Sequence, residues 1–262
     1  MADERAAIVK VTGLCKKYSK KADYAIKDVE FSCYEGEIVG LLGHNGAGKS
    51  TTIKCIEGML PFDEGEILID GHDIKKDPIK AKANMGFVTD NHAVFIKMTG
   101  MEYISFMATV YKVPNEVRQE RLNKLESIFC LGDAINNLIS SYSHGMRQKI
   151  CMMGSLIHNP KLWILDEPMT GLDPRTMRAV REFMHEYAAQ GNCIIFSSHA
   201  LNSVAHICDR VVLIRKGKQI SDINIKAMVT EDPSFDFEDY FLENERQAEE
   251  EIASEQTKEE TV

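Results

Sequence analysis

Short apolar runs alternate along the chain with longer segments in which apolar residues recur every three or four positions. Four of the short runs are typical of β-strands: residues 37–43, 162–166, 192–199 and 210–217. The first three are apolar at successive positions, which indicates strands buried on both faces of a parallel sheet. Residues 66–71 predict a further strand that ends in an Asp70-Gly71 turn, in a smaller antiparallel layer with the first forty residues.

The pattern changes to helical spacing between residues 91 and 158. Three segments there have this spacing, and no strand pattern interrupts them: residues 101–113, 115–131 and 146–158. The chain therefore predicts an α/β fold with a helical subdomain inserted at about 91–158. Near the end of the chain, Phe237, Tyr240 and Phe241 predict a short amphipathic helix that packs on the body, so we expect one folded domain over residues 1–242.

Composition adds a division between the body and the end of the chain. The 262 residues are 44% apolar, enough to bury a full core, and their formal net charge is −9. Residues 231–262 hold thirteen acidic and two basic side chains, which leaves residues 1–230 with a net charge of +2. We expect residues 243–262 to be an acidic, disordered tail. A nearly neutral body also argues against nucleic acid as a partner.

The cysteines and the longest apolar runs indicate the cellular compartment in which the chain works. Seven cysteines are scattered without a CxxC pair, which favours reduced, buried thiols in a cytosolic protein. No run approaches the ~18 apolar residues of a membrane span, and the first ten residues do not resemble a signal peptide. We expect a soluble chain, so any work at a membrane would need a membrane part from another polypeptide.

The stretch GHNGAGKS matches G-x-x-x-x-G-K-[ST] between a buried strand and a helical segment, the context of a P-loop. Its glycines allow backbone N–H groups to surround phosphates, Lys49 would reach the β- and γ-phosphates, and Ser50 would bind Mg²⁺. The alternative is a glycine-rich turn with a chance lysine. The expected nucleotide-binding residues are Gly43, His44, Asn45, Gly46, Ala47, Gly48, Lys49, Ser50 and Thr51, with His44 and Asn45 filling the loop.

Two further strand ends carry groups that suit a P-loop site. Asp166 and Glu167 follow the strand at 162–165, where Asp166 would bind Mg²⁺ and Glu167 would polarise the attacking water. The two acids could instead form a helix cap. His199 follows another strand and would contact the γ-phosphate and orient the water, although a lone histidine is more often structural.

A second candidate anion site lies in the stretch SSYSHGMRQK, residues 140–149. Ser143 and Gly145 flank a histidine where a helix is predicted to begin, a position suited to an anion. This loop contains no lysine at the position that Lys49 occupies in the first loop.

The series GHNGAGKST, SSYSHGMRQ, LWILDEPMTGLDP and SSH resembles the nucleotide-binding subunit of ABC transporters over about residues 8–242. The resemblance implies a P-loop NTPase core of the ABC ATPase fold, with ATP and Mg²⁺ as ligands. It also implies that two such domains bind head to tail, so that Ser143 and Gly145 contact the ATP held by a second ATP-binding subunit. That subunit could be an identical copy or a related chain.

The same resemblance implies further roles and shows two departures. Tyr18 matches the aromatic residue that stacks on adenine, although it could be an ordinary surface tyrosine, and residues 171–173 match the loop along the dimer seam. The usual signature LSGGQ has His144 in place of its first glycine and Met146 in place of its glutamine. Asp90 stands where the family's glutamine touches Mg²⁺ and the attacking water. Asp90 can still bind Mg²⁺ through water, but it is shorter and charged, so the hydrolysis rate or its coupling to transport is expected to differ.

The resemblance implies an ATPase subunit of a multi-subunit transporter, bound through transmembrane permease subunits to the cytoplasmic face of the cell membrane. An exporter is favoured by the YSHGM signature, the short C-terminal helix and the absence of an added regulatory domain. The groove for the permease would lie after Asp90: Val94, Phe95, Ile96 and Met98 either line it or fill the core, whereas Phe106 and Met107 are expected in the core.

Two other classes remain as alternatives. Soluble ABC ATPases that act on ribosomes or DNA usually carry two cassettes or long coiled-coil insertions, and neither pattern is visible here. A non-catalytic regulatory subunit is disfavoured by Lys49, Asp166, Glu167 and His199, although Asp90 leaves that interpretation open.

Overall fold

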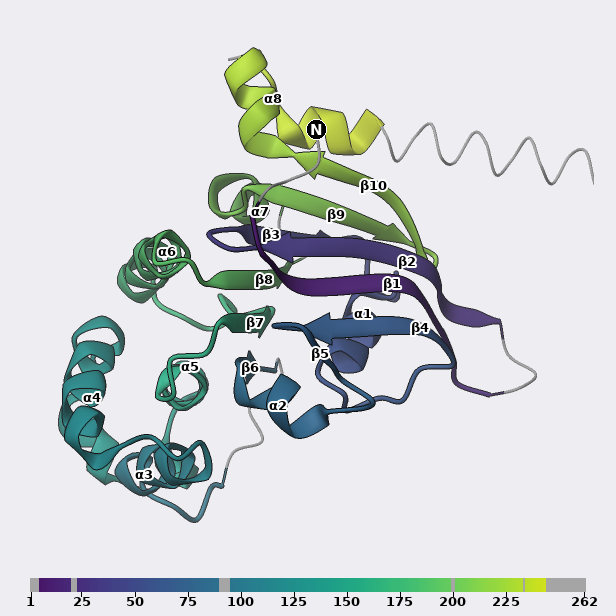
Figure 1. The fold of residues 1–262 in the computed structure, drawn as a ribbon. Coiled ribbons are helices and arrows are strands. Elements are labelled where there is room, and N and C mark those ends of the chain that lie inside the picture. The colour runs from purple at the N-terminus through teal and green to yellow at the C-terminus, as the bar shows by residue number, and fades with distance from the viewer. Residues whose placement is uncertain (1–4, 20–22, 90–94, 199–200, 233, 244–262) are drawn as a thin grey trace, which may run out of the picture.

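In the described part of the chain, ten strands form one curled sheet with a helical subdomain beside it (Figure 1). The structure, a computed structural model, describes residues 5–19, 23–89, 95–198, 201–232 and 234–243. The strands are β1 (Ala7–Lys17), β2 (Tyr24–Tyr34), β3 (Ile38–Leu42), β4 (Glu64–Ile69), β5 (His72–Asp73), β6 (Met85–Val88), β7 (Leu162–Asp166), β8 (Cys193–Ser198), β9 (Arg210–Arg215) and β10 (Lys218–Asn224). Their order across the sheet is β5-β4-β1-β2-β10-β9-β3-β8-β7-β6.

The parallel part of the sheet is buried on both faces, as its apolar runs predict. β3 pairs in parallel with β8 and β9, and β7 pairs in parallel with β8 and β6. Side chains alternate between the faces, so Ile38 and Leu42 enter one core cluster while Val39 and Leu41 enter the other. Every residue of β3, β7 and β8 is therefore buried.

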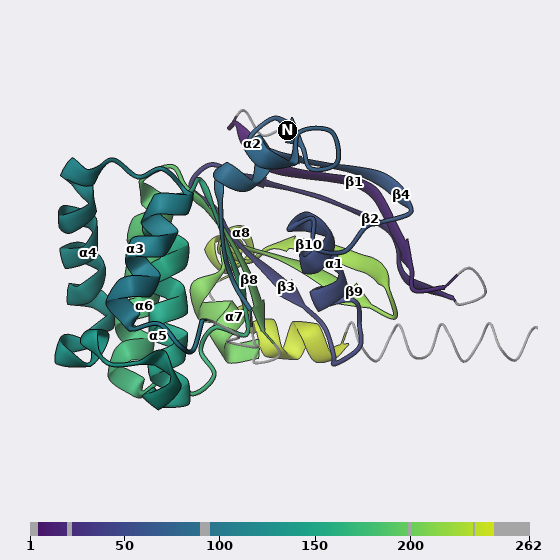
Figure 2. The same cartoon turned by 90° about the horizontal axis from the view of Figure 1, so that it is seen from below.

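The antiparallel layer covers one of those faces. β1 pairs with β2 and β4, and β4 turns into β5 through Asp70 and Gly71, both with positive φ. Helix α1 (Lys49–Ile56) lies between this layer and the parallel strands (Figure 2). Its Ile53 and Ile56 share a core cluster with residues of β1, β4 and β7. The strand expected at 66–71 and its turn are confirmed.

Helices cover the opposite face and extend beyond it. In chain order they are α3 (Gly100–Val110), α4 (Asn115–Phe129), α5 (His144–Leu156), α6 (Pro174–Ala189), α7 (Leu201–Ile207) and α8 (Ile225–Glu231). Helix α2 (Pro78–Ala83) lies on the other side, where its Ala81 packs in the same core cluster as α1. The three helices expected from the spacing between residues 101 and 158 are α3, α4 and α5. Thr99 begins α3 with a capping box, in which its hydroxyl and Glu102 each bond the other's backbone N–H.

Phe106 departs from the expected packing. Its side chain is 38% exposed, whereas the sequence places it in the core, and Met107 is partly buried as expected. The buried stripe of α3 includes Ile104 and Ala108, and Phe106 is two residues from each, roughly 200° around the helix. Phe106 instead contacts the exposed Phe95 edge to face at 5.2 Å.

The end of the described chain forms the expected short helix, at residues 237–243. Phe237 and Phe241 are buried in the core cluster that contains Ile38 and Leu42, on the face of the parallel sheet opposite the antiparallel layer. Tyr240 packs against the same cluster. The predicted acidic tail beyond this helix lies outside the described residues.

The cysteines follow the expectation of buried, reduced thiols with one exception: Cys130, at the end of α4, is exposed, while the other six are buried. Within the described ranges, every helix is too short or too polar to cross a membrane.

Glu57, directly after α1, is an ionisable residue buried inside the fold. Its side chain is 2% exposed, and its two carboxylate oxygens have no hydrogen-bond partner among the described residues. Burial, together with the smaller effect of the Asp166 charge, raises the pKa of Glu57 to about 9. The carboxyl group is therefore protonated in the folded protein at neutral pH.

Replacing Glu57 with glutamine should change how stability depends on pH. Unfolding releases the Glu57 proton between its ordinary pKa of 4.5 and its folded value of about 9, so the wild-type free energy of unfolding falls as pH rises through that window. The Glu57→Gln variant lacks this pH-dependent contribution. As pH rises, its free energy of unfolding should therefore increase relative to that of wild type, by up to about 1.4 kcal/mol per pH unit. Urea unfolding of both proteins at pH 5.5 and pH 8.5 checks this, and an unchanged difference would contradict it.

Candidate active site

A cavity of about 370 Å³ lies where β3 and β7 end, because parallel strands present their carboxyl ends at one edge of a sheet. It brings together the glycine-rich loop, the start of α1, the end of β7 and an aromatic residue after β1. Its lining residues are Tyr18, Ala25, His44, Asn45, Gly46, Gly48, Lys49, Ser50, Thr51, Asp166 and Glu167.

The glycine-rich loop is closely packed and needs its glycines. Gly43 has φ +152°, and a Cβ there would lie 2.1 Å from the carbonyl oxygen of Ile214. Gly48 has φ +117°, and a Cβ there would lie 2.8 Å from Ile26. The Ala47 carbonyl accepts a hydrogen bond of 2.8 Å from Gly217. The loop is thus held between β2 and the β9–β10 turn in a conformation that L side chains rarely adopt.

Lys49 places a cation inside the loop. Its ammonium donates to the carbonyl oxygens of Gly43 at 2.5 Å and His44 at 3.2 Å, and its side chain is buried. Burial lowers the pKa of Lys49, while the carboxylates of Glu167 and Asp166 act in the opposite direction. One buried cation and two acidic groups therefore face the same cavity.

Ser197 fixes the two acidic residues from the neighbouring strand. Its hydroxyl donates a short hydrogen bond to the buried carboxylate of Asp166, which lies opposite it in the β7–β8 register. The Glu167 N–H donates to the Ser197 carbonyl oxygen at 3.2 Å. Glu167 has φ +50°, a conformation that costs roughly 1–3 kcal/mol for a non-glycine residue and is common at active sites.

The oxygen ligands available in the cavity fit Mg²⁺. The Ser50 hydroxyl and the Asp166 carboxylate both line it, and Mg²⁺ prefers one or two protein oxygens together with phosphate oxygens and water. No cluster of three metal-binding side chains occurs within the described ranges. Asp90 and His199, the other predicted metal-binding and catalytic residues, lie outside the described residues.

Tyr18 stands at the mouth of the cavity. Its side chain is 66% exposed, and its hydroxyl bonds the Thr51 hydroxyl at 3.0 Å. The ring is thus held beside the start of α1 with its faces accessible.

The second predicted loop is separate from this cavity. Ser143 caps α5 by accepting a hydrogen bond from the Met146 N–H at 3.3 Å, and it is exposed. Ser143 and Gly145 are absent from the described lining of the cavity.

Two contacts at the site were not predicted from the sequence. The Phe241 ring of the 237–243 helix meets the His44 ring of the glycine-rich loop at 6.3 Å, and the buried Gln148 of α5 donates to the Pro168 carbonyl at 2.9 Å. The helical spacing does predict that Phe241 is buried, but spacing within one helix does not identify the partner. Gln148 lies in a polar run and gives no signal of burial.

Comparisons with known proteins agree with this geometry. Residues 26–170 match the family described as ABC transporter. YdbJ of Bacillus subtilis (strain 168), an uncharacterized ABC transporter ATP-binding protein, is 35% identical over 221 residues, or 84% of this chain and 70% of YdbJ. A solved structure described as the ATP binding subunit of an ABC transporter is 28% identical, with a TM-score of 0.84 over 90% of this chain and 99% of that one.

A second solved structure, cbiO1 from Clostridium perfringens, is described as part of the ABC transporter complex cbiONQ. It is 27% identical, with a TM-score of 0.73 over 86% of this chain and 91% of that one. The chain belongs to the ABC transporter family of ATP-binding proteins, and its fold is that of the family's ATPase domain.

The Phe241–His44 contact should contribute to nucleotide binding. Phe241→Leu keeps an apolar side chain in the core but removes the ring contact, worth about 0.5–1.5 kcal/mol. ATP affinity should therefore fall about 2–12-fold, measured by titration with a fluorescent ATP analogue. Leu242→Ala, on the same helix but 54% exposed, is the control and should bind like wild type. Equal affinities of the two variants would contradict a role for the ring contact.

Proposed function

We propose that this chain is the ATP-hydrolysing subunit of a multi-subunit ABC transporter, and that it works as a dimer beneath separate permease subunits at the cytoplasmic face of the cell membrane. One observation carries the proposal. The cavity combines a P-loop, a buried lysine and two carboxylates on one chain, while Ser143 of the second predicted loop is exposed and is absent from the described lining of the cavity.

The roles of the residues follow from their chemistry. Backbone N–H groups of the loop and the Lys49 ammonium would bind the β- and γ-phosphates of ATP, and Tyr18 would stack on adenine. Ser50 and Asp166, with Asp90, would hold Mg²⁺, which neutralises charge that develops on the phosphates. Glu167 would accept a proton from the attacking water.

His199 would orient that water beside Glu167. Acceptance of the water's proton by Glu167 would be general-base catalysis, which contributes about 10²–10⁴-fold to a reaction rate.

The exposed start of α5 supports a dimer. Ser143 and the first backbone N–H groups of a 13-residue helix form a site suited to an anion, yet they are absent from the described lining of their own chain's cavity. A second ATP-binding subunit, in head-to-tail arrangement, would bring Ser143 and Gly145 onto its partner's γ-phosphate. ATP would then join the two subunits, and hydrolysis would separate them.

An apolar surface on the helical subdomain supports docking to a permease. Phe95, Ile96 and Phe106 are 53%, 50% and 38% exposed and lie on or beside α3. This surface is connected to the second loop, because the Ile96 carbonyl accepts a hydrogen bond of 3.0 Å from Ser140, three residues before Ser143. A movement of the segment around Ile96 would therefore reach the loop that contacts the partner's ATP.

Export is the direction that we propose. The residues Tyr142–Met146 resemble the YSHGM signature of bacterial exporter subunits, and the short helix 237–243 resembles the one that closes many of them. The relation to cbiO1, described as part of the ABC transporter complex cbiONQ, supports assembly with other subunits.

Glu167→Gln should abolish most ATP hydrolysis and leave ATP binding intact. The loss in kcat should be about 10²–10⁴-fold if Glu167 is the general base. The control is Glu182→Gln, which removes an exposed carboxylate paired with Arg178 on α6 and should keep the wild-type rate. Phosphate release measures the rate, and similar rates in the two variants would refute the assignment of the base.

Phe106→Asp should reduce the amount of the protein that sediments with membranes of its native host, because a charge on the apolar surface opposes docking. Ile79→Asp is the matched control, since Ile79 is 83% exposed on α2, outside this surface. Sedimentation of the tagged variants, with ATP hydrolysis by the purified proteins as a check on folding, tests this. Equal membrane-bound fractions would exclude Phe106 from the docking surface.

A further inference from the structure

The first two turns of α5 contact the loop 167–173, which joins β7 to α6, along its length. The Gln148 amide donates to the Pro168 carbonyl oxygen at 2.9 Å, inside the protein, and the Lys149 ammonium lies 3.6 Å from the Asp173 carboxylate. A Cβ on Gly145 would lie 2.6 Å from the Gly171 carbonyl oxygen, so the two backbones touch. Helix α5 and the loop of its own chain are therefore packed together.

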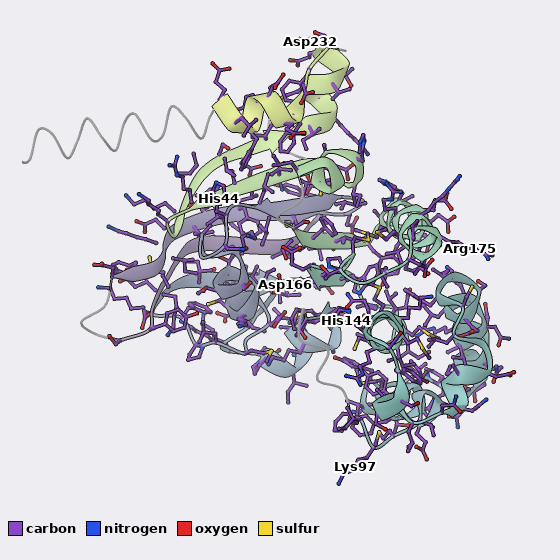
Figure 3. The ribbon with its side chains drawn as sticks, turned by 180° about the vertical axis from the view of Figure 1, so that it is seen from behind. His44, Lys97, His144, Asp166, Arg175 and Asp232 are labelled. Atoms are coloured by element: carbon purple, nitrogen blue, oxygen red, sulfur yellow. The ribbon has the colours of Figure 1, made fainter. Side chains whose placement is uncertain are left out.

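His144 adds a contact that depends on its size. A Cβ on Gly171 would lie 2.4 Å from His144 Nδ1, closer than real Cβ atoms approach, and a tight 3.1 Å from its Cε1. The imidazole ring thus occupies the side of Gly171 on which any other residue would carry its side chain. His144 is the first residue of α5, and Asp166 is the last of β7 (Figure 3).

The same loop begins with Glu167. The Glu167 backbone N–H is held by hydrogen bonds to Ser197 of β8. The next residue in the chain, Pro168, is bonded by Gln148 of α5. Its backbone has φ +50°, a conformation that persists only when its surroundings impose it. A displacement of the segment 168–171 would therefore move the Glu167 carboxylate.

We propose that His144 is a positioning residue that acts within its own chain: its ring, seated against Gly171, holds the loop 167–173 and thereby aligns Glu167 with the water it activates. This inference rests on the proposed function. It differs from the role expected of Ser143 and Gly145, which is to contact nucleotide on the partner. A change at the start of α5 is thus transmitted to the hydrolytic site of the same chain.

Mixed dimers distinguish an effect within the chain from an effect on the partner. Two differently tagged copies are purified in tandem, one of them carrying Glu167→Gln, so that only the copy with an intact Glu167 hydrolyses ATP. In the first pairing His144→Gly is placed in the copy with intact Glu167. In the second pairing it is placed in the copy with Glu167→Gln, whose second loop would face the active nucleotide.

The proposal predicts that kcat falls about fivefold or more in the first pairing, with KM for ATP unchanged, because small displacements of catalytic groups are costly. In the second pairing kcat should fall by a smaller factor. A loss in the second pairing equal to or larger than that in the first would overturn the proposal. A pairing with His144 intact in both copies that hydrolyses no ATP would instead refute the proposed function.

Gly171→Ala supplies a second test with a matched control. Gly171 and Gly71 have φ of +78° and +77°, but a Cβ on Gly71 meets nothing within 4 Å. Gly71→Ala therefore carries the backbone strain alone and should keep the wild-type kcat, whereas Gly171→Ala should lower kcat about fivefold or more by displacing the His144 ring. The double variant His144→Gly/Gly171→Ala should lose less than the product of the two single losses. Equal kcat in the two alanine variants, or losses that multiply, would overturn the proposal.

Discussion

The parallel alignment of β3, β8 and β7 is the constraint on which the site depends. In this register Leu42 lies opposite Ser198, and Ser197 lies opposite Asp166, so the P-loop, the acidic pair and the serine that bonds it all begin at one edge of the sheet. Burial on both faces holds that register, because a shift by one residue would exchange the side chains of the two core clusters. The strained Glu167 and the buried Lys49 are supported by this arrangement and have few alternative positions.

The core cluster that contains Ile38 and Leu42 connects this edge to more distant parts of the molecule. It joins the outer face of the sheet to α3, α5 and the helix 237–243, so that helix reaches the P-loop through Phe241 and His44. Helix α5 reaches the loop after β7 through Gln148, and the segment around Ile96 bonds the residues that precede α5. A path of direct contacts therefore runs from the exposed apolar surface to the acidic pair. In the account proposed here, that path couples permease movement to hydrolysis.

Much of the fold could be predicted from the sequence because its signals are local. Continuous apolar runs predict buried parallel strands, helical spacing predicts α3, α4 and α5, and Lys49 between glycines and a helix start indicates a phosphate site. The packing partners could not be predicted, because spacing within one element does not specify its neighbour. Phe106 turned out to be exposed for this reason, and the contacts of Phe241, Gln148 and His144 with distant segments became visible only in three dimensions.

In the dimer that we propose, two copies, or two related chains, share ATP between the P-loop of one and the second loop of the other. The most direct test of this sharing is the molar mass of the Glu167→Gln protein in solution, measured by light scattering with and without Mg²⁺ and ATP. The account predicts a monomer without ATP and a dimer with it, and it predicts a monomer in both conditions once Ser143→Arg is added to the same protein. An ATP-induced dimer that survives Ser143→Arg would contradict the shared site.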